Sequence, residues 1–229
     1  MHPFHEQFGS DSIIEAFYKP FKVAFTALQR RQDIFFAGQN EIDGFNSVWV
    51  ASMGHFMGLF DRPFIGIPAN HKITMLRYAE FHKVEEGQIK ETALFIDLLH
   101  LMAQVGITPI SQQTGMHLIQ PGPRPHDGLL FDGQNMQEGQ TTLALINRMI
   151  GDINEGQYTS PQEELRQCWH EDMHWWGPTG IGQPIPSSVI FNSINTRSGR
   201  RMKAAALTVI SAAWLRGIMV VFLAGQTSA

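Results

Sequence analysis

Three carboxylates, Glu80, Glu91 and Asp97, are the side chains of this sequence best placed for acid–base chemistry. They fall on two neighbouring predicted strands, residues 72–84 and 89–97, where positions of like parity share a face, so Glu91 and Asp97 should point the same way. A carboxyl group in an apolar pocket has a raised pKa and can exchange protons near neutral pH. The alternative is that these carboxylates are solvated or salt-bridged.

Weaker candidates accompany the carboxylates. Arg77 could be their salt-bridge partner, and His55 and His82 fall on predicted strands. A lone histidine is more often a surface or hydrogen-bonded residue than a catalyst. Aromatic side chains such as Trp49 and Phe95 could line a ligand cavity, although ordinary core packing explains the same aromatic content.

A zinc-like pattern lies near the C-terminal end. Residues 170–174 read H-E-D-M-H, which on a helix would place His170 and His174 one turn apart for zinc, with Glu171 as general base. The third histidine of the longer pattern is replaced by Gly180, and no acidic residue follows Asp172. A chance match is therefore preferred. The sequence also lacks a phosphate-binding glycine loop, so it predicts neither a metal nor another cofactor.

Composition excludes several classes of protein. The 229 residues allow one large domain or two small ones, and 43% are apolar, which is enough for a core. A net charge of -4 argues against a nucleic-acid binder that relies on overall positive charge. The single cysteine, Cys168, excludes a disulfide framework. The first residues show no secretory signal, so a cytoplasmic location is expected.

Residues 183–229 differ in composition from the rest of the chain. They hold no Asp or Glu but five of the 17 basic residues. An apolar run, residues 204–225, is long enough to span a bilayer, yet Arg216 would be costly there. Three interpretations are open: a membrane anchor, a buried helix, or a sequence that did not evolve with the rest.

The elements that must position the carboxylates predict an α+β fold. Asp11 can cap a helix over residues 12–30, which Pro20 kinks or breaks. Gly87 can supply the positive φ of a hairpin turn. The predicted strands are residues 32–38, 46–57, 72–84 and 89–97, and a short helix follows at 98–104.

A second unit is predicted after residues 107–140, which are rich in Pro, Gly and polar residues and are typical of a linker. It should contain helices at 141–153 and 161–168 and a strand at 170–176. The first helix places four apolar residues on one face: Leu143, Ile146, Met149 and Ile150.

Three short motifs carry a family resemblance. Gly66-Ile67-Pro68 forms a G-I-P loop, residues 84–89 read V-E-E-G-Q-I, and residues 101–106 fit L-x-x-Q-x-G. With Glu91 and Asp97 between the last two motifs, residues 7–106 resemble the SnoaL-like polyketide cyclases of the nuclear-transport-factor-like superfamily.

The resemblance implies a cone fold, in which a curved antiparallel sheet surrounds an apolar cavity closed by helices. It also implies cofactor-free ring closure by acid–base catalysis. Asp97 matches the family's catalytic aspartate, and Glu80 matches an acidic position on the preceding strand. The family histidine before the G-I-P loop is not matched, because Phe56 falls there and His55 is one residue away. Relatives with this fold are also isomerases, dehydratases, epoxide hydrolases or binding domains, so the fold does not choose among them.

The resemblance further suggests a tandem protein that is truncated at its N-terminus. Residues 170–182 resemble part of a second copy, and the resemblance stops at Gly182. Residues 183–203 and 214–229 can be back-translated so that an adjacent reading frame encodes family-like strings. The hypothesis is a frameshift near Gly182. The domains would then be a cone over residues 1–106, a linker over 107–140, the start of a second cone over 141–182, and an out-of-frame tail over 183–229.

The predicted function is that of a SnoaL-like cyclase, or related cofactor-free acid–base catalysis on a small apolar oxygenated substrate. The alternatives are a non-catalytic cone domain that binds a ligand or dimerises through its sheet, and an inactive truncated product. The predicted partners are a small hydrophobic molecule and a second copy of the chain, without nucleic acid or membrane. The predicted catalytic residues are Asp97 and Glu80, and the predicted pocket residues are Arg77, Glu91, His55, Trp49 and Phe95.

Overall fold

The structure is a computed structural model that describes residues 4–109, 126 and 128–155, together with the single residues 163, 167 and 179. The chain divides into two compact units. The first unit contains the N-terminal helices and the sheet, and the described part of the second contains residues 39–46 and 130–155.

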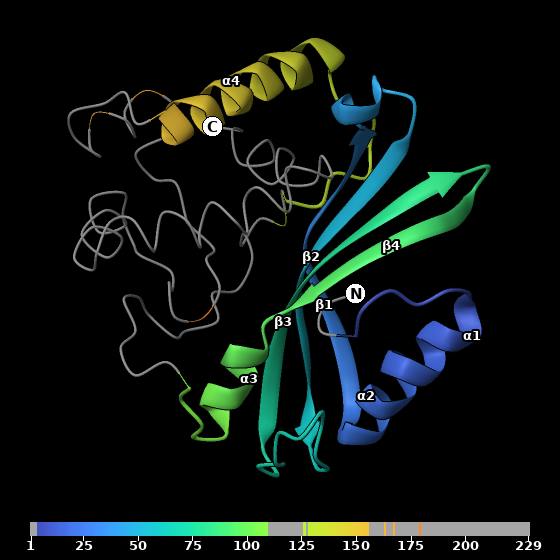
Figure 1. The fold of residues 1–229 in the computed structure, drawn as a ribbon, viewed down its shortest axis with the longest axis vertical. Coiled ribbons are helices and arrows are strands. Elements are labelled where there is room, and N and C mark those ends of the chain that lie inside the picture. The colour runs from blue at the N-terminus through green and yellow to red at the C-terminus, as the bar shows by residue number, and fades with distance from the viewer. Residues whose placement is uncertain are drawn as a thin grey trace. The chain divides into compact units, whose positions relative to one another are not determined.

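The first unit is a four-stranded sheet with helices at both of its chain ends (Figure 1). The strands follow one another in the order β1-β2-β3-β4, and β2, β3 and β4 pair antiparallel. This arrangement confirms the predicted α+β class. The elements are α1 (Ser10–Ile13), the π-helical turn η1 (Ile14–Tyr18), α2 (Lys19–Ala24), β1 (Phe25–Gln39), β2 (Val48–Phe60), β3 (Ile73–Glu85), β4 (Gln88–Ile96) and α3 (Leu98–Gln104).

The N-terminal helical region is shorter than predicted. Gly9 occupies the position before α1, and Asp11 lies in the first turn without capping it, so the predicted Asp11 cap is wrong. β1 already begins at Phe25, whose side chain stacks on Phe60 with ring centroids 4.7 Å apart. The helical spacing of aromatic residues therefore runs from α2 into the start of β1, because both elements pack against the same core. Pro20 is tolerated near the start of α2, directly after the π-helical turn.

The β3–β4 hairpin forms as predicted. Gly87 has a φ of +71°, which confirms its predicted role, and Glu86 also has a positive φ of +52°. Two successive residues of positive φ match the twist of a tight hairpin. A register irregularity lies between Lys83 and Val84, just before this turn.

β1 passes very close to β2 at Gly54. A Cβ atom at this position would lie 2.0 Å from the carbonyl oxygen of Arg31. Gly54 is therefore required for the close approach of the β1 backbone to β2.

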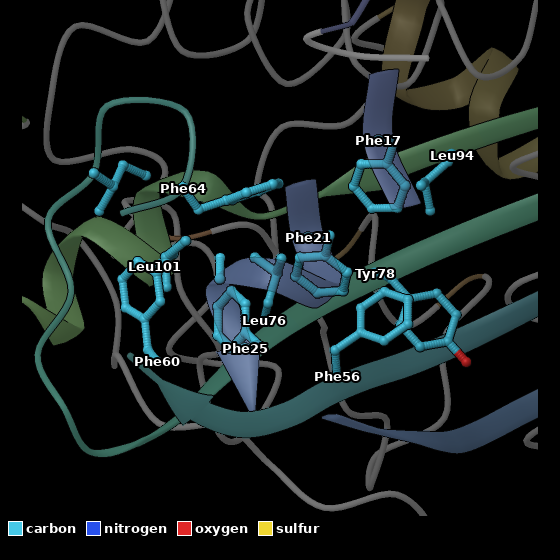
Figure 2. Close-up of a cluster of buried hydrophobic side chains, with 12 residues drawn as sticks. Phe17, Phe21, Phe25, Phe56, Phe60, Phe64, Leu76, Tyr78, Leu94 and Leu101 are labelled. Carbon is cyan, nitrogen blue, oxygen red and sulfur yellow. The ribbon is translucent and has the colours of Figure 1, made fainter. Parts of the chain in front are cut away.

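An aromatic-rich cluster of described residues forms the core of the first unit (Figure 2). Helical Phe17 and Phe21 are fully buried and stack with centroids 5.2 Å apart. Phe21 in turn meets Phe56 of β2 edge-on at 5.0 Å, so the helices cover the sheet through aromatic contacts. The cluster consists of Phe17, Phe21, Ala24, Phe25, Phe56, Phe60, Phe64, Ile67, Leu76, Tyr78, Leu94 and Leu101.

Two of the resemblance motifs have structural roles. The G-I-P loop makes a tight turn in which Phe64 and Ile67 exchange backbone hydrogen bonds of 3.0 and 2.9 Å and both enter the core. In the L-x-x-Q-x-G motif, Gln104 donates to the Met75 carbonyl at 2.6 Å and accepts from the Met75 N–H at 3.0 Å. The Gln104 side-chain amide thus makes the pair of backbone hydrogen bonds that a neighbouring strand would make, and it joins α3 to β3.

The described part of the second unit holds the 3₁₀ turn η2 (Glu41–Asp43) and the helix α4 (Met136–Glu155). Asn147 of α4 donates a 2.8 Å hydrogen bond to Glu41. Ile146 and Met149 are buried, as their predicted shared face requires. α4 begins at Met136, within the stretch predicted to be a linker and before the predicted helix start at residue 141.

Several predictions fall outside the described residues: the helix at 161–168, the strand at 170–176, the H-E-x-x-H pattern and the tail at 183–229. The helices that the structure describes include none that is long and apolar enough to cross a membrane.

Candidate functional site

The alternation of side chains along β3 divides the sheet into two faces. Tyr78, Glu80 and His82 project on one face, with Ser52 opposite Glu80 on β2 and Thr92 opposite His82 on β4. We call this the Glu80 face. The other face carries the residues of odd number on β3, and we call it the Arg77 face.

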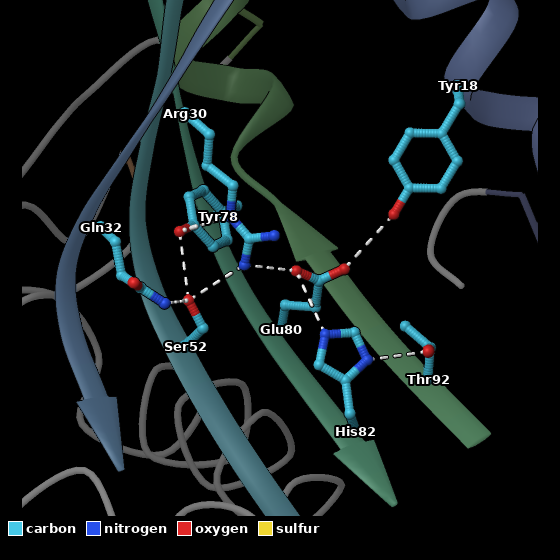
Figure 3. A network of polar contacts seen from close by, with 8 residues as sticks. All are labelled: Tyr18, Arg30, Gln32, Ser52, Tyr78, Glu80, His82 and Thr92. Atoms are coloured by element: carbon cyan, nitrogen blue, oxygen red, sulfur yellow. Dashed lines mark hydrogen bonds and ion pairs between the residues drawn. The ribbon is translucent and has the colours of Figure 1, made fainter. Parts of the chain in front are cut away.

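Glu80 is the centre of a polar network on the Glu80 face (Figure 3). Its side chain is 2% exposed. One oxygen, Oε2, lies 2.7 Å from Arg30 Nη2 and 3.5 Å from His82 Nε2. The other, Oε1, accepts a long hydrogen bond of 3.5 Å from the Tyr18 hydroxyl. A buried carboxylate is thus surrounded by two nitrogen groups and a phenol.

These contacts decide the ionisation of Glu80. Burial raises the pKa of Glu80, but the contact with His82 and the charge of Arg30 outweigh burial and lower it below the ordinary value. The raised pKa expected for a carboxyl group among apolar residues is therefore wrong for Glu80. The carboxylate is ionised at neutral pH.

Arg30 is held from several sides. Its Nε donates to the Tyr78 hydroxyl at 2.9 Å, and its Nη2 donates to Ser52 Oγ at 3.0 Å. The guanidinium also lies 4.8 Å from the centre of the Tyr78 ring. Burial opposes the charged form, but the Tyr78 hydrogen bond and the Glu80 charge outweigh it, so the pKa of Arg30 is raised. Gln32 extends the network by donating to Ser52 at 2.9 Å.

Two further groups complete the site. His82 Nδ1 lies 2.9 Å from Thr92 Oγ1, which fixes the imidazole ring beside Glu80. Burial raises the pKa of Tyr18, and the negative charge of Glu80 raises it further, so this hydroxyl stays protonated. The arrangement offers one proton acceptor, one phenolic donor and one guanidinium beside an aromatic core.

Asp97, the other predicted catalytic residue, lies in a different network. Its Oδ1 accepts a 3.0 Å hydrogen bond from the backbone N–H of His100, which caps α3. Its Oδ2 forms an ion pair with Arg77. Because Arg77 alternates with Glu80 along β3, the pair belongs to the Arg77 face.

Most of the predicted pocket residues also fall on the Arg77 face. His55 lies opposite Arg77 in the sheet register, and its Nδ1 is 3.2 Å from Asp33 Oδ2. Trp49 is on the same face of β2 and donates to Ser47 at 2.9 Å.

The predicted β4 residues are exposed. Phe95 is 42% exposed and makes an edge contact with Phe81, with centroids 6.2 Å apart. Glu91 is exposed and lies opposite Lys83. Of the seven predicted site residues, the structure thus places Glu80 on the Glu80 face, and its contacts there are with Tyr18, Arg30 and His82 rather than with the other six.

Sequence reasoning missed most of the Glu80 network. The spacing of Tyr78, Glu80 and His82 at every second position of a predicted strand is a signal that could have grouped them. Tyr18 and Arg30 gave no such signal, because both fell within one predicted helix, whereas Arg30 belongs to β1.

The described residues contain no group of three His, Cys, Asp or Glu side chains arranged to hold a metal ion.

Comparisons with known proteins give one limited similarity. No protein-family model matches the chain, and no curated protein matches it. A crystal structure from Jannaschia sp. CCS1, described as that of a candidate SnoaL-like polyketide cyclase, is similar to it at 22% identity with a TM-score of 0.32. The match covers 42% of this chain and 60% of that one.

Proposed function

We propose that the Glu80 face carries out cofactor-free acid–base catalysis on a small, largely apolar carbonyl compound. The observation that supports this proposal is the buried Glu80 carboxylate, 2% exposed and ionised, in contact with a protonated phenol 3.5 Å away. An ionised proton acceptor and a proton donor in contact with each other are the two groups that enolisation of a carbonyl compound needs. This is also the class of chemistry that the resemblance to SnoaL-like cyclases implies.

In the proposed reaction, Glu80 takes a proton from the carbon next to the substrate carbonyl. The electrons of the broken C–H bond form a C=C bond, and the carbonyl electrons move to oxygen to give an enolate. Ring closure follows when the enolate carbon attacks a second carbonyl carbon of the same molecule, whose π electrons move to its oxygen, and that oxygen takes back the proton held by Glu80. Isomerisation follows when Glu80 returns the proton to a different carbon of an extended enolate. Tyr18 covers Glu80 through a hydrogen bond at the long limit of 3.5 Å, so a substrate can replace it at little cost.

The direction of the Glu80 pKa shift restricts the substrate. A carboxylate whose pKa is lowered is fully ionised at neutral pH but is a weak base. Proton transfer to a weak base is efficient only from an acidic C–H group. We therefore expect 1,3-dicarbonyl compounds, whose central C–H is acidified by two carbonyl groups, rather than simple ketones.

Exchange of substrate hydrogen for deuterium tests the proposal directly. The purified chain in D₂O should accelerate exchange of the central hydrogens of apolar 1,3-diketones and β-keto esters, measured by proton NMR. Glu80→Gln should lower this rate by about 100-fold or more, the usual contribution of a general base. Glu91→Gln is the matched control because Glu91 is an exposed carboxylate of the same sheet, and it should leave the rate unchanged. Equal rates for the unmodified chain and Glu80→Gln would refute the proposal.

Asp97 remains the second predicted base, and the same assay separates the two carboxylates. If Glu80 is the base, Asp97→Asn should change the exchange rate only as far as it destabilises the fold, because Asp97 is a helix cap paired with Arg77. If Asp97 is the base, Asp97→Asn removes exchange while Glu80→Gln retains it. Thermal unfolding of both variants shows whether a lost rate reflects lost structure.

Ligand binding without turnover is the second candidate function. The lowered pKa of Glu80 favours it, because an ionised, weakly basic carboxylate is a good hydrogen-bond acceptor for a ligand hydroxyl. Saturable binding of an apolar 1,3-diketone, without deuterium exchange above the Glu80→Gln rate, would assign this function.

A further inference from the structure

We propose that Arg30 is the oxyanion-binding residue of this site, and that the substrate carbonyl oxygen docks on the Nη1 edge of its guanidinium. This inference rests on the proposed function and specifies which atom receives the substrate. The substrate class that follows is a carbonyl compound whose oxygen becomes anionic during the reaction.

The hydrogen-bond donors of Arg30 are unevenly used. A guanidinium has five N–H donors. Nε donates to Tyr78, and Nη2 donates to Ser52 and forms an ion pair with Glu80. No described residue makes a hydrogen bond or ion pair with Nη1, and Figure 3 draws one guanidinium nitrogen without a dashed line. Two N–H donors therefore remain for a ligand.

The guanidinium is also fixed and reachable. Tyr78 holds it through both a hydrogen bond of 2.9 Å and a ring contact of 4.8 Å. The Arg30 side chain is 42% exposed, whereas that of Glu80 is 2% exposed. A molecule that enters from solvent therefore meets Arg30 before it meets the carboxylate. Donors that are fixed before the reaction stabilise a developing charge without reorganisation.

Charge transfer explains why this position suits an oxyanion. Before the reaction, the negative charge is on Glu80, with Oε2 2.7 Å from Arg30 Nη2. When the carbon-bound proton moves to Glu80 Oε1, the carboxyl group becomes neutral and the substrate oxygen takes the negative charge. Through Nη2, Arg30 contacts Glu80, which gives up the negative charge. Through Nη1, it would contact the substrate oxygen, which receives that charge. The positive charge stays in place, and the reverse proton transfer restores the starting state.

A phenolate that mimics the enolate tests the inference independently of turnover. The probe is 4-nitrophenolate, followed by its absorbance, with 4-nitroanisole as the neutral comparison. Glu80→Gln mimics the protonated glutamate, so it should bind 4-nitrophenolate about tenfold or more tighter than the unmodified chain does. Adding Arg30→Gln should remove at least tenfold of that affinity, as expected for a hydrogen bond to a charged group. Binding of 4-nitroanisole should not change.

The controls separate charge, shape and folding. Arg31→Gln is the matched control, since Arg31 is the neighbouring exposed arginine of β1 and its side chain alternates away from Arg30. It should leave phenolate affinity unchanged in the Glu80→Gln chain. Arg30→Lys keeps the charge but loses the planar fork, so it should retain only part of the affinity. Thermal unfolding confirms that each variant is folded before its affinity is compared.

Two results would overturn the assignment of Arg30: equal phenolate affinity with and without Arg30→Gln, or no phenolate binding by Glu80→Gln. The exchange assay distinguishes this failure from failure of the proposed function. If exchange depends on Glu80 but phenolate affinity does not depend on Arg30, the function stands and the inference falls. If phenolate affinity depends on Arg30 but the chain causes no exchange, the site binds oxyanions without the proposed catalysis.

Discussion

The two faces of the sheet arrange their charged and polar groups differently. On the Arg77 face, the groups meet in separate pairs: Arg77 forms an ion pair with Asp97, and His55 Nδ1 lies 3.2 Å from Asp33 Oδ2. On the Glu80 face, several donors converge on one carboxylate that is 2% exposed. Pairing joins and stabilises elements, whereas convergence on one buried group concentrates electrostatic potential at a single atom. This contrast is why the Glu80 face is the better candidate site.

The largest expected effect comes from removing the aromatic support of the Glu80 face. Phe60 is fully buried and stacks on Phe25, so Phe60→Ala should lower the free energy of unfolding by about 3–5 kcal/mol. Phe95→Ala, on the Arg77 face, should cost much less because Phe95 is 42% exposed. Urea denaturation of both variants measures the difference. Similar losses would show that the two faces contribute equally to the core.

A smaller effect is expected from the paired charges of the Arg77 face. Asp97→Ala removes the cap of α3 and the partner of Arg77, and should cost about 1–3 kcal/mol. Asp97→Asn keeps a side-chain oxygen for the cap and should cost less. If thermal unfolding shows no difference between Asp97→Ala and the unmodified chain, the structural role given to Asp97 is refuted.

The smallest effect is a pH dependence that belongs to the Glu80 face. The pKa of Glu80 is lower in the folded chain than its ordinary value of 4.5, so the unfolded chain binds the extra proton first as the pH falls. Glu80 therefore stabilises the fold above that pH, and this contribution is lost as the pH falls from about 4.5 through the folded-state pKa. Urea denaturation between pH 7 and pH 3 should show a steeper loss for the unmodified chain than for Glu80→Gln. Parallel curves would contradict the ionised state assigned to Glu80.

Local sequence signals predicted much of the fold of the first unit. The turn at Gly87, the strands on either side of it and the α3 helix lie close to their predicted positions, because each depends on short-range patterns of glycine and alternating side chains. The helix predicted over residues 12–30 was too long. Its aromatic spacing reflects one core that both α2 and β1 face, and spacing alone does not show where a helix changes into a strand.

The candidate site was predicted only in part for a related reason. Glu80 was identified as an acidic residue on a predicted strand, but its grouping with Asp97 assumed that both carboxylates serve one site. The structure places them in separate networks, since Asp97 caps α3 and pairs with Arg77. Successive side chains of β3 point to opposite faces of the sheet, so Arg77 and Glu80 lie on different faces. Composition and resemblance do not reveal that difference.

The sequence by itself determined the α+β class, the β3–β4 hairpin and the presence of acidic residues on adjacent strands, because these follow from local backbone preferences and side-chain alternation. Only the tertiary structure decided which of those residues act together. Gly54 lets β1 approach β2 closely, Arg30 of β1 meets Glu80 of β3, and the helical segment brings Tyr18 over Glu80, across 62 residues of sequence. That convergence, with the lowered pKa it produces, depends on long-range packing and not on any local pattern.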